Sequence, residues 1–168
     1  MPTRETEFRT VLGQFATGVT VITVAGGGGR VHGMTANAFA SVSLSPALVL
    51  VCIDESARTH PLIHKHKCFG VNVLGEEHQD LAEYFARPVE DHERAERLGI
   101  AYWFTERGTP MLKDSLAYLD CTVVSSHDEG DHTVFIGAVE ELGYRAGRPL
   151  LFFRGKYNRL EADKTRED

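Results

Sequence analysis

The chain has 168 residues, of which 42% are hydrophobic and 25% are charged, and its formal net charge is −6. These values are typical of one globular domain and exclude a fibrous repeat or a largely disordered chain. They also argue against a nucleic-acid-binding protein, because proteins that neutralise phosphates concentrate Lys and Arg on one surface and this sequence has no basic stripe.

The end regions and the cysteines predict a cytoplasmic protein of one domain. The first residues lack the basic and apolar regions of a signal peptide, and no apolar run is long enough to span a bilayer. Cys52, Cys68 and Cys121 are odd in number and widely spaced, which fits reduced thiols better than a disulfide framework. Residues 1–160 are expected to form the domain, and the charged residues 161–168 a disordered tail.

The first elements along the chain are a helix and a β-hairpin. Apolar residues at the spacing of one helical face predict the helix: Phe8, Val11, Leu12 and Phe15. Thr3 is its expected N-cap, and Gly18 its expected end. Residues 19–24 are β-branched and predict a strand, and the glycines 26–29 turn the chain into a second strand. A phosphate-binding glycine loop is the disfavoured alternative, because no helix pattern follows these glycines.

The rest of the chain predicts many short strands and few helices. Residues 47–53 are a continuous apolar run, which indicates a strand buried on both faces. Short helices are expected at 62–67 and 76–87, and a solvated helix or loop at 91–98. Further strands are expected at 69–74, 101–105, 116–124, 133–142 and 150–154. Without a regular β–α alternation, these elements predict a barrel-like, mainly β domain with flanking helices.

Residues 32–46 form the stretch most suggestive of ligand binding. Small residues there let a backbone approach a ligand, and Thr35, Asn37, Ser41 and Ser43 supply donors and acceptors. This composition suits a flat heteroaromatic ligand. The alternative, which composition alone favours, is a loop whose Thr, Asn and Ser side chains bond their own backbone.

Three other groups of residues could carry chemistry. Ser56, Arg58 and Thr59 follow an apolar strand, where Arg58 can bind a phosphate or form a surface salt bridge with Asp54 or Glu55. His132 opens the strand at 133–142, where a lone histidine is most often solvated. The third group, His60, His64, His66 and Cys68, is disfavoured as a metal site, because metal ligands must converge at about 2 Å.

Five sequence blocks in a fixed order resemble the flavin reductase family with the split-barrel FMN-binding fold. The blocks are GVTVITV, GMTANAFASVSLSP, ALVLVCID, FGVNVL and GDHTVFIGAVEEL, and the resemblance extends from about Phe8 to Tyr157. It implies an NAD(P)H:flavin oxidoreductase that transfers hydride from NADH or NADPH to FMN or FAD. It also implies a homodimer that passes reduced flavin to a partner monooxygenase. A flavin-binding protein without turnover and an FMN-dependent oxidase of the pyridoxamine-phosphate type are the alternatives.

The resemblance also implies the roles of individual residues. The phosphate would be bound by Ser56, Arg58 and Thr59. The flavin ring would be held by Thr35, Ala36, Asn37, Ala38, Ser41, Val42, Ser43, Cys52, Ile53 and Asp54. Ala38 stands where many relatives have serine, which removes one hydroxyl contact. His132 would orient the nicotinamide and supply a proton, Arg154 and Tyr157 would lie near the cofactor, and no metal is required.

Overall fold

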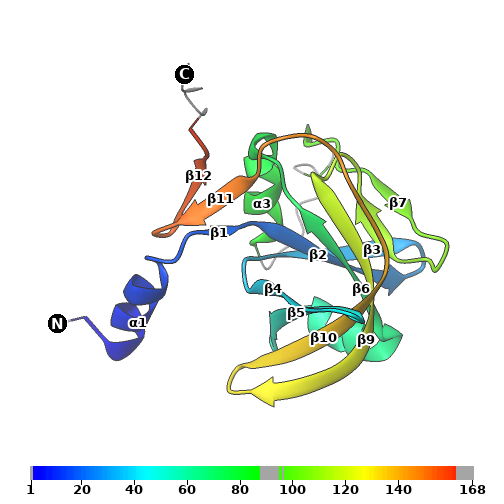
Figure 1. Cartoon of the computed structure of the whole chain (residues 1–168), viewed down its shortest axis with the longest axis horizontal. Coiled ribbons are helices and arrows are strands. Elements are labelled where there is room, and N and C mark those ends of the chain that lie inside the picture. The colour runs from blue at the N-terminus through cyan, green and yellow to red at the C-terminus, as the bar shows by residue number, and fades with distance from the viewer. Residues whose placement is uncertain (1, 88–94, 96, 162–168) are drawn as a thin grey trace.

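The computed structural model describes residues 2–87, 95 and 97–161 of the chain (Figure 1). Its helices and 3-10 helix are α1 (Arg4–Leu12), α2 (Thr59–His66), η1 (Glu76–His78) and α3 (Gln79–Phe85). The first strands are β1 (Thr17–Gly18), β2 (Thr20–Gly27), β3 (Arg30–Ala36), β4 (Phe39–Leu44), β5 (Ala47–Asp54) and β6 (Cys68–Val73). The later strands are β7 (Tyr102–Phe104), β8 (Pro110–Leu112), β9 (Ala117–Glu129), β10 (His132–Tyr144), β11 (Leu150–Phe153) and β12 (Lys156–Arg159).

The main sheet has seven antiparallel strands in the order β3-β2-β6-β9-β10-β5-β4. Its two edges, β3 and β4, are consecutive along the chain and are joined by only Asn37 and Ala38. So short a connection cannot cross a flat sheet, because neighbouring strands lie about 4.8 Å apart. The sheet therefore curls until its edges approach each other. The predicted barrel with flanking helices is confirmed, as a barrel left open between β3 and β4.

Two apolar clusters form the core, one on each side of β2. The first fills the interior of the curled sheet and includes Ile22, Ile53, Phe69 and Phe135, with Ile63 of α2 packed among them. The second lies between the sheet and α3. Its buried members are Val19, Val21, Leu74, Ala82, Phe85, Leu112 and Leu150. The two flanking helices therefore pack on different apolar clusters.

Strand β5 is buried on one face, and the prediction that both faces are buried is wrong. Val49, Val51 and Ile53 are buried, whereas the alternate residues from Leu48 to Asp54 are only partly buried. Alternate side chains of a strand point to opposite faces, so the second set lies on the outside of the curled sheet. The apolar run in the sequence therefore reflects two different surfaces, the core and an outer face.

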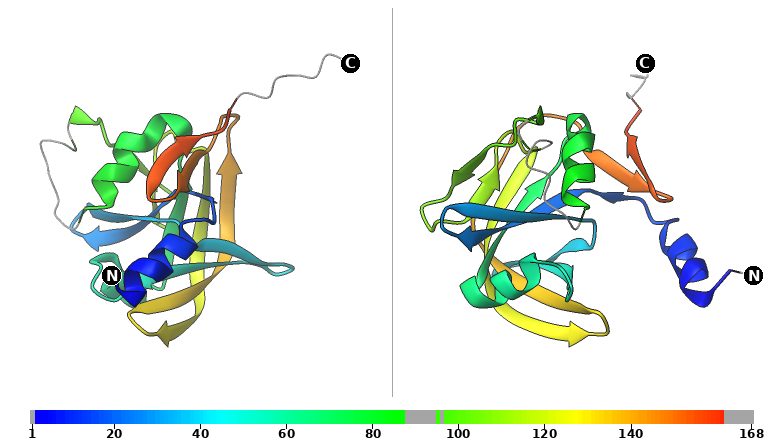
Figure 2. Two further views of the ribbon diagram at one scale, coloured as in Figure 1. Left: turned by 90° about the vertical axis from the view of Figure 1, so that its left-hand side faces the viewer. Right: turned by 180° about the vertical axis from the view of Figure 1, so that it is seen from behind.

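Helix α1 projects from the barrel beside the hairpin of β11 and β12, as Figures 1 and 2 show. Thr3 is its N-cap, as predicted, and its hydroxyl accepts a hydrogen bond from the backbone N–H of Thr6 at 3.3 Å. The helix ends at Leu12, well before the predicted end at Gly18. Its apolar stripe has no cover within the described chain, since Phe8 is 62% exposed and Phe15 is 76% exposed.

The remaining predictions of this kind have mixed outcomes. Gly28 and Gly29 form the turn of a β2–β3 hairpin, as expected. Cys52, Cys68 and Cys121 are free thiols. Within the described ranges, no helix is long and apolar enough to cross a membrane. Of the predicted helix or loop at 91–98, residues 91–94 and 96 lie outside the described residues, and so do residues 162–168 of the predicted tail.

Candidate functional site

A cleft of about 300 Å³ opens where β3, the loop after β5 and the end of α3 meet. Five of the residues predicted to bind the cofactor line it: Thr35, Asp54, Ser56, Arg58 and Thr59. His32, Gly33 and Met34 of the predicted stretch 32–46 also line it. The lining is completed by residues that the sequence did not single out: Ala57, Phe85, Ala86 and Arg87. The structure thus brings the predicted phosphate loop together with one end of the stretch 32–46, and adds a helix as a further wall.

The loop after β5 is shaped by Asp54. Its Oδ1 accepts hydrogen bonds from the hydroxyl of Ser56 at 2.6 Å and from the backbone N–H of Ser56 at 2.7 Å. The Ser56 hydroxyl, followed by its N–H, holds the pKa of the Asp54 carboxyl below its usual value. This Asx-type turn leads the chain to Arg58, whose side chain is exposed immediately before α2.

Both hydroxyls predicted for phosphate binding have partners inside the protein. That of Ser56 is bonded to Asp54, and that of Thr59 donates to Sδ of Met34 at 2.9 Å. Thr59 is also almost fully buried. Both hydroxyls are therefore already engaged within the protein, whereas Arg58 lines the cleft at the start of α2.

Helix α3 closes against β3 at one glycine. A Cβ atom on Gly33 would lie 2.7 Å from Cε1 of Phe85, so only glycine leaves room for this ring. The Thr35 hydroxyl donates to the carbonyl of Ala82 at 2.6 Å, which fastens β3 to α3. The Thr35 hydroxyl therefore stabilises the packing of α3 on β3, which forms one wall of the cleft. The same packing places Arg87 in the lining of the cleft.

The predicted ring-binding residues continue from the cleft along β4 and β5. The backbone N–H of Cys52 donates to the carbonyl of Ala38 at 3.0 Å, which holds the exposed turn at residues 37–38 beside β5. Farther along, Ser41 pairs with Val49 and Ser43 with Leu48. The span of β5 from Leu48 to the cleft is about 20 Å at roughly 3.3 Å per residue. The predicted residues thus form an extended track that begins at the phosphate loop.

Two of the predicted ring contacts are part of the core. The side chain of Ile53 is fully buried, and Ala36 is 8% exposed. Their backbone groups, rather than their side chains, are what they can offer a ligand. Val42, by contrast, is 47% exposed and lies on the surface of the track.

His132 lies next to the phosphate loop, although 78 positions separate it from Asp54 in the sequence. It opens β10 and pairs across the ladder with Asp54. The backbone N–H of Glu55 donates to the carbonyl of Asp131 at 3.1 Å, which ties the loop to the same turn. Nδ1 of His132 is 2.7 Å from the Asp131 carboxylate, a contact that lowers the pKa of Asp131. Because a carboxylate only accepts, Nδ1 carries a proton and Nε2 is left for other contacts.

Arg154 and Tyr157 lie away from this cleft within one chain. The Arg154 guanidinium donates twice to Oε1 of Gln14, at 2.7 and 2.9 Å, and so holds the end of α1. The ring of Tyr157 packs against Phe152, and burial, with a smaller contribution from Glu83, raises the pKa of Tyr157. Neither residue lines the cleft that contains Arg58.

The histidines of α2 do not form a metal centre with their neighbours. The rings of His60 and His64 meet edge to face, with centroids 4.7 Å apart. His66 is exposed. Across the part of the chain that the structure describes, no three His, Cys, Asp or Glu residues are arranged to hold a metal ion.

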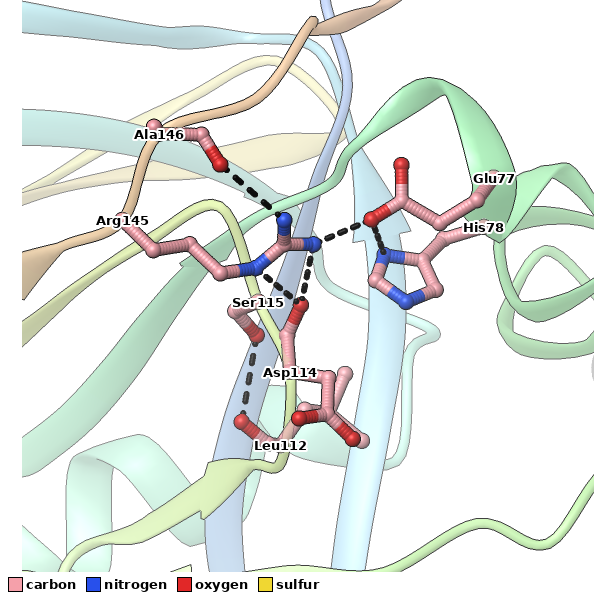
Figure 3. A network of polar contacts seen from close by, with 7 residues as sticks. All are labelled: Glu77, His78, Leu112, Asp114, Ser115, Arg145 and Ala146. Carbon is pink, nitrogen blue, oxygen red and sulfur yellow. Dashed lines mark hydrogen bonds and ion pairs between the residues drawn. The ribbon is translucent and has the colours of Figure 1, made fainter.

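A separate polar network surrounds Arg145, as Figure 3 shows. The guanidinium donates to the carbonyl of Asp114 at 2.7 and 3.0 Å, and it also pairs with Glu77 of η1. His78 lies 3.9 Å from the Glu77 carboxylate, and burial lowers the pKa of His78. The network joins the segment before α3 to the turn between β8 and β9. It therefore supports the position of α3 and includes none of the predicted cofactor residues.

An open β-barrel with a cationic cleft and a track of small and hydroxyl-bearing residues defines a protein suited to a planar cofactor that carries a phosphate. Residues 12–161 match the family model described as a flavin reductase like domain. The chain therefore belongs to the flavin reductase family, and the resemblance seen in the sequence is confirmed.

Individual relatives agree with this assignment. The reductase subunit HsaB of a flavin-dependent monooxygenase from Rhodococcus jostii is 45% identical, over 94% of this chain and 79% of that protein. The solved flavin reductase PheA2 is 43% identical with a TM-score of 0.83, covering 96% of this chain and all of that chain. The NADH:FAD oxidoreductase SgcE6 of Streptomyces globisporus, solved with NAD and FAD fragments, is 36% identical with a TM-score of 0.84, covering 98% and 97%. The chain is thus an oxidoreductase of the flavin reductase type.

Proposed function

We propose that this enzyme binds the phosphate of FMN or FAD at Arg58, holds the flavin ring along β4 and β5, and binds NADH or NADPH on the side of His132. The observation that carries the proposal is the pairing of His132 with Asp54, which places the first residue of β10 beside the predicted phosphate loop. Two groups with different predicted tasks, distant in sequence, thereby meet where β5 ends and β10 begins. A partner monooxygenase would receive the reduced flavin, the arrangement that the name of HsaB describes for that relative.

The cleft fits such a cofactor. Arg58 and the first turn of α2 would bind the phosphate. The backbone near Asn37 and Ala38 is exposed and would bind the polar atoms of the flavin ring. When bound, flavin supplies the redox chemistry by accepting hydride from the nicotinamide at its N5 atom. The residues bind and orient the two ring systems and limit the access of water, and His132 orients the nicotinamide and holds a proton.

The assay that tests this function follows NADH consumption in air with and without added FMN or FAD. Oxidation of NADH that depends on flavin supports the proposal. Flavin binding without NADH oxidation would instead indicate a carrier or sensor. Oxidation of pyridoxamine phosphate without NADH consumption would indicate an oxidase. Cytoplasmic location is part of the proposal, since the cytoplasm keeps thiols such as Cys52, Cys68 and Cys121 reduced.

Replacing Asn37 with alanine is expected to weaken flavin binding without unfolding the protein. Asn37 is exposed in the β3–β4 turn, so its side chain contributes little to the core. Loss of a ligand hydrogen bond costs about 0.5–1.5 kcal/mol, or roughly two- to twelvefold in affinity. Fluorescence titration with FMN and thermal unfolding of the flavin-free protein measure the two effects. A drop of several kcal/mol in stability with unchanged flavin affinity would show that Asn37 is a structural turn residue.

A homodimer is the assembly that we propose, with α1 as part of its interface. Phe8, Val11 and Leu12 on this helix, and Phe15 just beyond its end, are exposed, and Leu44 and Tyr144 on the sheet are 94% and 87% exposed. A soluble chain rarely leaves so many large apolar side chains uncovered. A second copy would cover these side chains and would also bury the partly exposed outer face of β5.

Replacing Phe8 and Phe15 together with aspartate is therefore expected to shift the protein toward monomers. Neither side chain is buried in the single chain, so the variant chain should still fold as a monomer. Light scattering after size-exclusion chromatography, over a range of concentrations, measures the change. Thr10→Asp, on the opposite face of α1, is the matched control and should leave the association unchanged. A double variant as dimeric as the wild type would remove α1 from the proposed interface.

A further inference from the structure

A short chain of hydrogen bonds joins α2 to β10 behind the candidate site. Nε2 of His60, the second residue of α2, lies 2.8 Å from Oγ1 of Thr133. The Thr133 hydroxyl in turn donates to Oδ1 of Asp128 at 2.9 Å. Thr133 is fully buried and directly follows His132 in the sequence. The chain therefore connects the start of α2, the start of β10 and the end of β9.

The direction of these bonds fixes the protonation of His60. A hydroxyl has one hydrogen, and that of Thr133 is donated to Asp128. Oγ1 must therefore accept a hydrogen bond from the N–H at Nε2 of His60. The imidazole is also packed edge to face against Phe135, with centroids 5.8 Å apart, and against His64. His60 is thus held in one orientation by a hydrogen bond at its tip and by rings at its sides.

Arg58 lies between two points at which its segment is attached to residues 131–133, where the chain enters β10. On one side, the backbone N–H of Glu55 donates to the carbonyl of Asp131. On the other, His60 bonds to Thr133. Residues 56–59 connect these two points. Both attachments therefore fix the backbone from which the exposed Arg58 side chain extends. The same two attachments bracket His132, which lies between Asp131 and Thr133.

We propose that His60 is a positioning residue, which through Thr133 holds the phosphate loop in register with the strand that begins at His132. The proposal rests on the phosphate-binding role given to Arg58 above. The Arg58 side chain is exposed and lines the cleft, and the backbone of residues 56–59 sets the point from which it extends. His60 contributes that rigidity from inside the barrel without touching the ligand.

The test compares His60→Leu, which removes the hydrogen bond, with His60→Gln, whose amide can still donate to Thr133. The measured quantity is phosphate selectivity, the dissociation constant of riboflavin divided by that of FMN, for the full-length folded protein. His60→Leu is expected to lower this ratio about three- to tenfold, which lies within the range of roughly two- to twelvefold that corresponds to one lost hydrogen bond. His60→Gln should retain most of it. A purely structural role would lower the melting temperature and leave the ratio unchanged, which would overturn the proposal.

Thr133→Val and Thr133→Ser provide a second pair that does not alter α2. Valine has the shape of threonine but lacks the acceptor, so Thr133→Val should lower the selectivity as His60→Leu does, and Thr133→Ser should preserve it. This pair keeps the proposal testable if His60→Leu does not fold. Equal selectivity in the valine and serine variants would contradict the proposed link.

The same measurement in an Arg58→Ala background separates this inference from the function on which it rests. If Arg58→Ala abolishes the selectivity, and His60→Leu lowers it alone but adds nothing further in the Arg58→Ala background, both assignments are supported, because coupled residues act non-additively. If Arg58→Ala has no effect on the selectivity, the phosphate assignment itself fails. If Arg58→Ala abolishes the selectivity but His60→Leu alone does not change it, only the role of His60 is refuted.

Discussion

Replacing Arg58 with alanine is expected to weaken FMN binding by about tenfold or more, while the affinity for riboflavin stays nearly the same. Riboflavin lacks the phosphate, so it has nothing to lose when the guanidinium is removed. A charge-assisted contact of this kind is worth about 1.5–3 kcal/mol. Titration of both flavins by fluorescence quenching measures the difference directly.

Two further variants make this expectation specific. Arg58→Lys keeps the charge but not the forked geometry, so it should recover only part of the lost affinity. Arg159→Ala removes an exposed arginine of β12 that lies outside the cleft and should change neither affinity. Equal losses for FMN and riboflavin in Arg58→Ala would show that the residue supports the loop rather than the phosphate.

Local sequence signals predicted the strands and the order of the site segments. The β-branched run before Gly26 and the glycines after it predicted the β2–β3 hairpin, because turn chemistry and strand propensity are local properties. Arg58 was found for a similar reason, since it follows an apolar strand where a loop must emerge. His132, by contrast, depended on family resemblance. Its pairing with Asp54 is a long-range register that spacing alone does not encode.

The far wall of the cleft was missed because it depends on the packing of a helix on a strand. The helix at 76–87 was predicted, but its contact with β3 was not. Gly33 was interpreted as room for a ligand, whereas in the structure it makes room for Phe85. A glycine inside a strand does signal close approach, yet the sequence does not say of what. Arg87 reaches the cleft only as a consequence of this docking.

The outer surface posed the opposite difficulty. The apolar stripe on α1 was interpreted as one face of a helix, and the apolar run in β5 was interpreted as buried on both faces, as apolar residues usually are. In the single chain the stripe on α1 is exposed, and the outer residues of β5 are only partly covered. Hydrophobic patterns report burial without stating whether the same chain or another copy provides it. The error in β5 is therefore informative, because it marks the surface on which the proposed dimer depends.

Replacing His132 with alanine is expected to lower NADH turnover by roughly ten- to a thousandfold and to leave flavin binding nearly intact. The flavin keeps Arg58 and the track along β4 and β5, none of which depends on the imidazole. The matched control is His127→Ala, an exposed histidine on the neighbouring strand β9. It should change neither flavin binding nor turnover.

Rapid mixing of the flavin-loaded enzyme with NADH separates the two ways in which His132 can act. If the imidazole only positions the nicotinamide, the dissociation constant for NADH rises and the limiting rate of flavin reduction stays the same. If it also holds a proton needed in the transition state, the limiting rate falls. Asp131→Asn should then give a partial effect, because the Asp131 carboxylate fixes the proton on Nδ1 that leaves Nε2 facing other groups. No change in either quantity for His132→Ala would make His132 an ordinary residue of the turn before β10, and the nicotinamide side of the site would have to be sought elsewhere on the track.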